Sequence, residues 1–296
     1  MKIIPVIIGP TCVGKTDLAL KIATETNAHI ISIDSRQVFE DLDLGTGKIK
    51  SNSKILKSNY VWNVDGVKIF GYNVYRPNEE LNVIKYAQFI KSILSEFSDD
   101  NFIVTCGTGF YLNFLMGNVE FTEIDIDRKK ELESKSLLEL QEIYSSHNDN
   151  SKIDSKNKVR LVTRILSLED PYKNKDSFKI AGVNFEIYYL TESREYLYDK
   201  ADRFIDDIFN KNVVGEYLDV VNKYGLVRSL TGLIYKEIGN YLHQFISYSE
   251  MVERCKFDMH AYIRRQETFF KKFNVKIKTN DRDLIFSEIL KTFNSK

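Results

Sequence analysis

The sequence from Lys2 to Ser35 reads KIIPVIIGPTCVGKTDLALKIATETNAHIISIDS and contains a complete strand, helix and strand unit. Ile3–Ile8 is a short β-branched run that ends at a glycine, which is typical of a buried strand in a parallel sheet. Asp17–Thr26 has the apolar spacing of an amphipathic helix. His29–Ile33 is a second apolar run. This order predicts a parallel sheet flanked by helices.

The loop between the first strand and the helix, Gly9–Thr16, fits the pattern G-x-x-x-x-G-K-[ST] at every fixed position. In such a loop the glycines let successive backbone N–H groups point at an anion, Lys15 adds a positive charge, and the Thr16 hydroxyl can bind a phosphate-bound magnesium ion. The alternative is a chance match in a glycine turn. Because a strand precedes the loop and a helix follows it, we predict a phosphate-binding loop.

Asp34 and Ser35 follow directly after the second strand. Ligands of open α/β sheets bind at the carboxyl ends of the strands, so both side chains are expected at the ligand-binding edge. By position alone, Asp34 is a magnesium ligand, a proton acceptor or a cap for the helix that follows. These three interpretations stay open at this point.

The composition is that of an ordinary globular protein. The 296 residues are 43% hydrophobic and 28% charged, and 42 basic side chains balance 42 acidic ones, so any nucleic-acid surface must be a local patch. Three widely separated cysteines indicate neither a disulfide framework nor a metal site. Without a membrane-length apolar run or a signal peptide, we expect a cytoplasmic protein, and without a heptad or repeat pattern we expect a monomer.

Further segments extend the same sheet. Phe102–Cys106 predicts another buried strand, and Gly107-Thr108-Gly109 after it opens on the edge that carries the phosphate loop, where Thr108 can hydrogen-bond a ligand. The weaker indications are a helix from Glu79 to Phe97, strands at Val67–Phe70, Tyr72–Tyr75 and Phe185–Leu190, a glycine-bearing loop at Asp43–Lys48, and a poorly patterned polar stretch at Ser51–Asn63.

The character of the sequence changes between residues 118 and 174, where it is charged and helix-forming with few β-branched runs. We predict a helical insertion there, with helices over Arg128–Ser146 and Lys156–Glu169. The remaining parts, 1–117 and 175–296, are expected to form one α/β core, a P-loop NTPase-like parallel sheet flanked by helices.

Everything after Arg194 is predicted to be helical, with a long helix over Tyr248–Phe273. One face of that helix is aromatic and is expected to lie in the core. Another face carries Lys256, His260, Arg264 and Lys271. That face is either a solvated surface or a track for a phosphate backbone.

Together these segments resemble the tRNA dimethylallyltransferases, also called tRNA isopentenyltransferases. The matching motifs occur in the family's order over nearly the whole chain, which is far more selective than a phosphate loop alone. They are Gly9–Thr16, Ile31–Phe39, Asp43–Lys48, Gly107–Leu112, the helix with Arg160 and Arg164, Tyr235–Glu237 and Arg264–Phe269.

The resemblance implies transfer of a dimethylallyl group from dimethylallyl diphosphate to N6 of the adenosine 3′-adjacent to the anticodon in tRNA, with Mg²⁺ bound through Thr16. It implies two catalytic residues, Asp34 as the base and Thr11 as a contact to the diphosphate. The diphosphate would be bound by Gly9, Pro10, Thr11, Cys12, Val13, Gly14, Lys15 and Thr16, with Arg203 as a further contact. The anticodon stem-loop, gripped in part by the insertion, would be bound by Asp34, Ser35, Arg36, Gln37, Thr108, Arg160, Arg164, Lys236, Arg264, Arg265 and Gln266.

Three positions depart from the family's pattern. Phe204 stands where a second diphosphate-binding arginine is usual, and Arg203 is one residue away, about a quarter-turn around the helix. Ile234 replaces a glycine, and Met259–Ala261 replaces T-R-Q. Two alternatives therefore remain: prenyl or phosphoryl transfer to a free nucleotide, and a catalytically silent tRNA-binding protein.

Overall fold

The computed structural model describes residues 1–48, 55–58, 60–121, 125–149, 151, 153–169 and 176–294. The chain divides into two compact units. The main unit consists of Met1–Met116 and Lys179–Lys296, and the insertion unit is Gly117–Phe178. The insertion thus begins one residue before, and ends four residues after, the range 118–174 that the sequence indicated.

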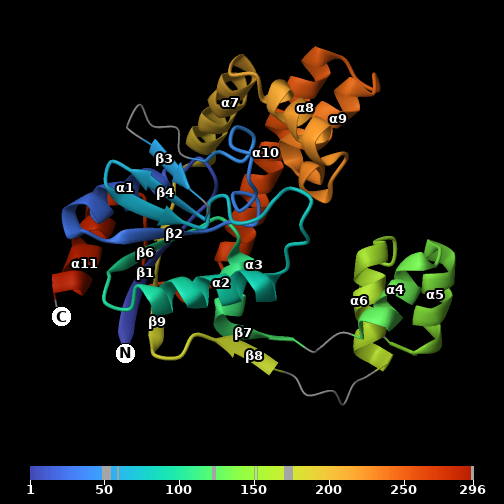
Figure 1. Ribbon diagram of the computed structural model, residues 1–296, viewed down its shortest axis with the longest axis horizontal. Coiled ribbons are helices and arrows are strands. Elements are labelled where there is room, and N and C mark those ends of the chain that lie inside the picture. The colour runs from blue at the N-terminus through green and yellow to red at the C-terminus, as the bar shows by residue number, and fades with distance from the viewer. Residues whose placement is uncertain are drawn as a thin grey trace. The chain divides into compact units, whose positions relative to one another are not determined.

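The main unit is built on one eight-stranded sheet with the order β10-β9-β1-β6-β2-β5-β4-β3 (Figure 1). The first six strands in this order run parallel, and β4 and β3 add an antiparallel edge. The bounds are β1 Lys2–Ile8, β2 His29–Ile33, β3 Ile55–Ser58, β4 Val61–Val64, β5 Val67–Phe70, β6 Phe102–Cys106, β9 Val183–Leu190 and β10 Ile277–Thr279. The predicted α/β class with a parallel sheet is confirmed.

The register of the three central strands decides where the loops meet. Ile8 at the end of β1 is paired with Cys106 at the end of β6, and Cys106 is paired with Ile33 at the end of β2. The next residues are the first glycine of the phosphate loop, Gly107 and Asp34. These three loops therefore leave the sheet at one level, on neighbouring strands.

Helices cover the sheet and form a separate layer beside it. α1 packs against α11 and on β6, while α7 and α9 pack on α10 at the other end of the unit (Figure 1). The bounds are α1 Lys15–Thr26, α2 Val83–Glu96, α3 Gly109–Leu115, α7 Arg194–Asn210, α8 Val213–Tyr224, α9 Leu233–Leu242, α10 Tyr248–Phe270 and α11 Arg282–Asn294, with a 3₁₀ turn at Arg228–Thr231.

Several local predictions are wrong. Tyr72–Tyr75 is not a strand, because only Tyr75 forms an isolated bridge, with Phe39. The polar stretch before it contributes β3 and β4, whose apolar side chains include the buried Trp62. The region after Arg194 is not all helical, because the short strand β10 joins the sheet edge beside β9.

The insertion unit is a bundle of three helices: α4 Ile126–Ser134, α5 Leu137–Ser146 and α6 Lys158–Glu169. The predicted single helix over Arg128–Ser146 is wrong, because Ser136 begins a new helix with a capping box that involves Glu139. The chain leaves and re-enters the main unit through two paired strands, β7 Met116–Phe121 and β8 Asp176–Lys179, which the sequence analysis did not predict.

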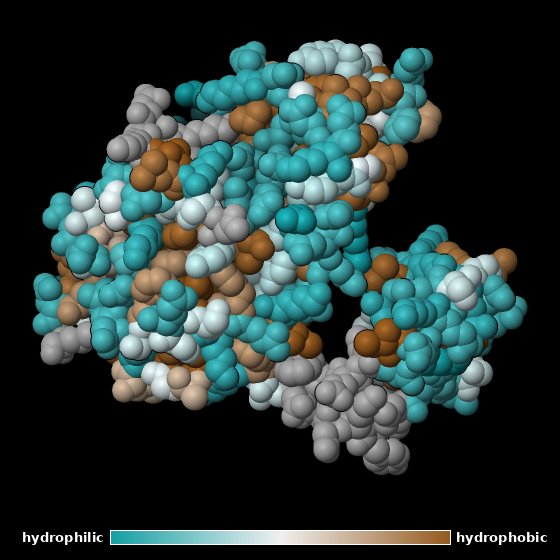
Figure 2. All heavy atoms as spheres, in the orientation of Figure 1, coloured by the Kyte–Doolittle hydropathy of each residue, from teal (hydrophilic) through white to brown (hydrophobic). Residues whose placement is uncertain are grey.

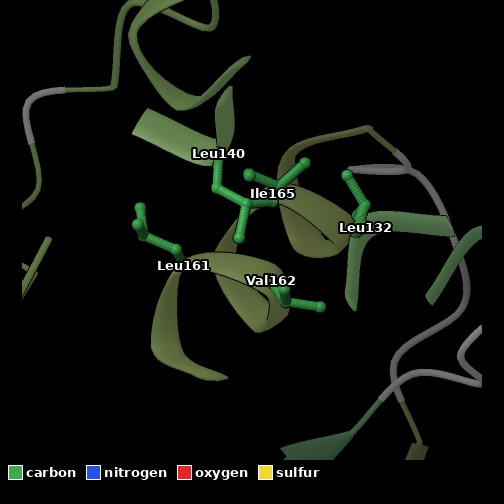
Figure 3. Packing of buried hydrophobic residues seen from close by; sticks show 5 residues of the cluster. All are labelled: Leu132, Leu140, Leu161, Val162 and Ile165. Carbon is green, nitrogen blue, oxygen red and sulfur yellow. The ribbon is translucent and has the colours of Figure 1, made fainter. Parts of the chain in front are cut away.

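A small apolar cluster holds the three inserted helices together. Figure 3 shows its five buried side chains, Leu132, Leu140, Leu161, Val162 and Ile165, which come from all three helices. The face of this unit seen in Figure 2 is mostly hydrophilic, in agreement with the use of its apolar residues in that cluster. In the described part of the chain, every helix is too short or too polar to span a bilayer.

Candidate active site

A cavity of about 850 Å³ opens in the main unit at the carboxyl edge of the sheet. Its floor is formed by the loops after β1, β6 and β2, and its walls come from the loop 45–48 and from α7, α9 and α10. Thr11, Lys15, Thr16, Asp34 and Gln37 are among the residues that line it. The phosphate loop and the aspartate after β2 therefore share one pocket.

The phosphate loop adopts a conformation that needs its glycines. Gly9 and Gly14 have φ angles of 155° and 89°, and a Cβ atom on Gly9 would overlap the carbonyl oxygen of Leu190. The Lys15 side chain folds back over the loop, and its Nζ donates to the carbonyl oxygens of Gly9 and Pro10, each at 2.8 Å. The ammonium is thus held at the centre of the loop.

Burial changes the proton affinity of the two principal charges. Loss of hydration lowers the pKa of Lys15 to about 8, although Cys106 and Asp34 oppose the shift. Loss of hydration also raises the pKa of Asp34 above its ordinary value, and hydrogen bonds from the backbone N–H groups of Arg36 and Gln37 only partly offset it. A carboxylate with a raised pKa is a better proton acceptor than an exposed one.

Asp34 uses its two oxygens differently. Oδ1 accepts hydrogen bonds from the N–H groups of Arg36, at 2.8 Å, and Gln37, at 3.3 Å, and so caps the turn that follows β2. Oδ2 lies against Gly107, where a Cβ atom would overlap it. No helix follows β2 within the described residues 34–48, so the helix-cap interpretation is wrong: one oxygen caps a turn instead, while the carboxyl group as a whole still lines the cavity.

Polar side chains tie the loops around Asp34 together. The Thr108 Oγ1 accepts from the N–H of Ser35 at 3.0 Å. The Gln37 Oε1 accepts from Ser32 Oγ at 2.7 Å, and its Nε2 donates to the carbonyl oxygens of Thr46 and Gly47 at 3.2 and 3.3 Å. Ser35, Gln37 and Thr108 are thus brought together in the lining of one cavity.

Gln266 on α10 joins the phosphate loop to the turn after β6. Its Oε1 accepts from the N–H of Thr11 at 2.8 Å, and its Nε2 donates to the carbonyl oxygen of Gly107 at 2.9 Å. The residue is only 6% exposed, and both ends of its amide are engaged in these loops. Gln266 therefore clamps the two loops, a role that motif matching did not suggest.

The structure does not bring all predicted diphosphate ligands to the cavity. Arg203 is exposed and forms an ion pair with Asp199 at 3.0 Å, one turn away on α7. Phe204 lines the cavity instead, and Asp207 and Lys211 follow it on the same helix face. Arg203 is absent from the cavity lining because it lies on a neighbouring face of α7.

The predicted RNA-binding lysines and arginines of the main unit divide between the cavity and the surface. Arg265 lines the cavity, and Arg36 reaches the carbonyl oxygen of Ser229 at 3.4 Å. Arg264 is exposed and donates to Tyr198 Oη at 2.9 Å. Lys236 is also exposed and pairs with the buried Glu237 at 2.8 Å.

The cationic face of α10 is partly neutralised by α7. Lys256 pairs with Asp206 at 2.7 Å, and His260 contacts Asp202 at 2.8 Å. These side chains face an acidic helix, so they are not a free track for phosphates. The opposite face is core in part, as predicted: Met259, Ile263 and Phe270 are buried, whereas Tyr262 lines the cavity and the buried Phe273 lies beyond the end of α10.

Arg160 and Arg164 belong to the insertion unit and do not line the cavity. Arg160 is exposed on α6. Arg164 Nε contacts Asp149 Oδ2 at 2.6 Å, so this arginine is already used to fasten the segment after α5 to α6.

Two residues at the site had no local signal in the sequence. Arg282 at the start of α11 donates to the carbonyl oxygen of Val13 at 3.0 Å and supports the phosphate loop from outside. Glu216 on α8 binds the backbone of the loop 43–45. Both act across more than 170 residues, which no short motif reveals.

The side chains around the phosphate loop suit a magnesium ion that arrives with a phosphate ligand better than one held by the protein alone. Thr16 offers a hydroxyl at the cavity, and the described residues contain no group of three or more His, Cys, Asp or Glu side chains able to hold a metal. Magnesium ions that accompany phosphates are held mainly by phosphate oxygens and water. The residues present fit that arrangement.

Fold and site together define an α/β protein in which a loop with the phosphate-binding pattern and a carboxylate line one cavity. A family model described as IPP transferase matches residues 37–273, and a second, described as Isopentenyl transferase, matches residues 2–71. The chain belongs to the IPP transferase family. The tRNA dimethylallyltransferase of Clostridioides difficile is 31% identical over 293 residues, which cover 92% of this chain and 90% of that relative.

Solved structures share the fold. A tRNA delta(2)-isopentenylpyrophosphate transferase from Staphylococcus epidermidis is similar with a TM-score of 0.70 and 24% identity, over 100% of this chain and 99% of that one. A eukaryotic dimethylallyltransferase acting on tRNA gives a TM-score of 0.73 at 18% identity, over 94% of this chain and 73% of that one.

Proposed function

We propose that this protein transfers a dimethylallyl group from dimethylallyl diphosphate to N6 of the adenosine 3′-adjacent to the anticodon in tRNA. The family membership supports prenyl transfer to tRNA, since curated relatives carry that activity in their name. The observation that carries the proposal is the shared pocket, in which a phosphate loop and a carboxylate follow the ends of β1 and β2.

The spacing of these two groups suits a transfer between two substrates. One strand, β6, lies between β1 and β2, and strands lie about 4.8 Å apart, so the two loops start roughly 10 Å from each other. That distance is too long for direct contact. It leaves room for a leaving group, the reacting carbon and an incoming nitrogen between them.

On the donor side, the backbone N–H groups of the phosphate loop and the Lys15 ammonium would bind the diphosphate. These donors are fixed in advance by the glycine conformations, so they stabilise the charge that develops as the C–O bond to the diphosphate breaks. Thr11 lines the cavity and would contact the same group. Thr16 would hold Mg²⁺, which supplies further positive charge to the diphosphate when bound.

On the acceptor side, we infer that Asp34 orients the exocyclic amine and takes its proton. As the new bond forms between N6 and the allylic carbon, the nitrogen must lose one proton, and diphosphate departs with the electron pair of the C–O bond. The raised pKa of Asp34 supports this role. Ser35, Arg36, Gln37 and Thr108 would contact the nucleotide.

A base in a stem-loop must leave its stack to enter a pocket of this kind. Arg265 lines the cavity, and Arg264 and Lys236 are exposed on the same helical layer, so they are candidates for phosphate contacts of the RNA. We also infer that Arg160 on the insertion contacts the anticodon stem-loop.

The test is a reaction of the protein with dimethylallyl diphosphate, Mg²⁺ and unmodified tRNA, followed by mass analysis of the nucleosides. The expected product is an adenosine that carries one added dimethylallyl group next to the anticodon. Asp34→Asn is the sharpest variant, because the amide oxygen can still accept from Arg36 and Gln37 while the negative charge is lost. We expect its single-turnover rate to fall by roughly 100-fold or more.

Asp65→Asn serves as the matched control, since Asp65 is exposed in the turn between β4 and β5. It should react like the wild type. Absence of prenylated adenosine at saturating donor would overturn the proposal. Product formed equally well from free AMP would instead select the free-nucleotide alternative.

A further inference from the structure

The loop 43–45 is bound by a single carboxylate from another part of the chain. Glu216 Oε2 accepts from the N–H groups of Asp43 and Leu44 at 2.8 and 2.7 Å, and Oε1 accepts from the N–H of Gly45 at 3.1 Å. The Tyr235 hydroxyl adds a fourth donor to Oε1 at 2.6 Å. Three successive amides that converge on one anion form a nest, which strongly favours a carboxylate.

The geometry leaves little freedom for other side chains. A Cβ atom on Gly45 would lie 2.5 Å from Tyr235 Cζ, so the tyrosine ring is in close contact with this glycine and holds it against α9. An amide in place of the Glu216 carboxylate would offer only one acceptor oxygen, and its NH₂ group would face backbone N–H groups. The four donors therefore require both oxygens of a carboxylate.

The bound loop continues directly into the wall of the cavity. Residues 45–48 line the cavity, and Gln37 Nε2 donates to the carbonyl oxygens of Thr46 and Gly47. The backbone N–H of Gln37 in turn donates to Asp34 Oδ1 at 3.3 Å. A continuous set of hydrogen bonds thus connects Glu216 to the carboxyl group on the acceptor side.

The phosphate loop is held by other residues. Its contacts are with Gln266 on α10 and Arg282 on α11, and neither of these hydrogen bonds involves the loop 43–48. A change at Glu216 should therefore act on the acceptor side of the pocket and spare the donor side.

We propose that Glu216 is a positioning residue for acceptor chemistry: it fixes the loop 43–48 and, through Gln37, the orientation of Asp34. This inference rests on the proposed transfer reaction and assigns to it a residue remote from the reacting atoms. The position of the base strongly affects the reaction rate, because a displacement of about 1 Å can slow a reaction roughly 100-fold.

The test compares Glu216→Gln with Glu216→Asp and with Glu253→Gln, an exposed position on α10. For Glu216→Gln we expect kcat with tRNA to fall by about tenfold or more, while the Kd for inorganic pyrophosphate and the KM for dimethylallyl diphosphate stay within about twofold. Glu216→Asp keeps the charge and should recover part of kcat. Glu253→Gln should behave like the wild type.

Amide hydrogen exchange gives a second readout that does not need activity. The N–H groups of residues 43–45 should exchange faster in Glu216→Gln than in the wild type. Unchanged exchange, or an unchanged kcat in an active enzyme, would overturn the inference. Parallel loss of pyrophosphate binding would also overturn it, because it would indicate general unfolding. A wild type without activity would instead refute the proposed function. Amide hydrogen exchange would still test whether Glu216 fixes the loop 43–45.

Discussion

Replacement of Gln266 by methionine tests whether this side chain clamps the phosphate loop. Methionine has a similar length and fills the same space, but it can neither accept from Thr11 N–H nor donate to the Gly107 carbonyl oxygen. Gln266 is 6% exposed, and a methionine of similar size would cover the two backbone groups that now lie 2.8 and 2.9 Å from the glutamine amide. The variant therefore leaves one donor and one acceptor unpaired.

The expected loss of stability follows from these two groups. Each unpaired buried polar group costs about 1 to 3 kcal/mol, and the added apolar burial of methionine offsets part of that, so we expect a net loss of roughly 2 to 4 kcal/mol. Trp62 is the single tryptophan and is buried in β4 of the main unit, so its fluorescence during urea unfolding reports on this unit. The transition midpoint should move to lower urea.

Gln88→Met is the matched control, because Gln88 is exposed on α2. It should change the unfolding free energy by no more than about 0.5 kcal/mol. Wild-type stability in Gln266→Met, within the same limit, would refute the clamp. Pyrophosphate affinity should also fall in Gln266→Met, because the loop loses a support next to Thr11.

Three further outcomes are expected. Lys48→Met should lower the unfolding free energy by roughly 2 to 3 kcal/mol in urea titrations, because Lys48 is buried against Asp43. Lys57 is an exposed partner of the same carboxylate, so Lys57→Met should lower the unfolding free energy by less than about 1 kcal/mol. The proposed diphosphate complex requires the protonated form of Lys15, whose pKa burial lowers to about 8. Calorimetric pyrophosphate affinity should therefore decline between pH 7 and 9 relative to Lys15→Met, and equal pH profiles would contradict this. Ile165→Ala should destabilise the insertion unit by about 2 to 5 kcal/mol, with an earlier loss of helical circular dichroism and an unchanged Trp62 transition.

The sequence was sufficient wherever a short pattern determines the structure by itself. The first strand, the phosphate loop and the helix after it form one local unit, and Asp34 follows the next strand by simple chain order. Because the ends of parallel strands meet at one edge, the common pocket could be expected as well.

Other features depend on contacts that the sequence does not encode locally. The cationic face of α10 had two interpretations, and only the position of α7 shows that Lys256 and His260 face acidic partners. β10 has just three residues, too few for a recognisable alternation. The break between α4 and α5 depends on Ser136, whose capping box lies within a charged, helix-forming run.

The phosphate loop is among the first parts of the chain to be synthesised, yet its supports come last. Thr11 and its partner Gln266 are 255 residues apart, and Val13 and Arg282 are 269 apart. At a translation rate of about 5 to 20 residues per second, the finished loop would wait about 13 to 54 s for these partners. The two neighbours of β1 in the sheet, β6 and β9, also come later in the chain, so this apolar strand must stay unpaired for part of that time.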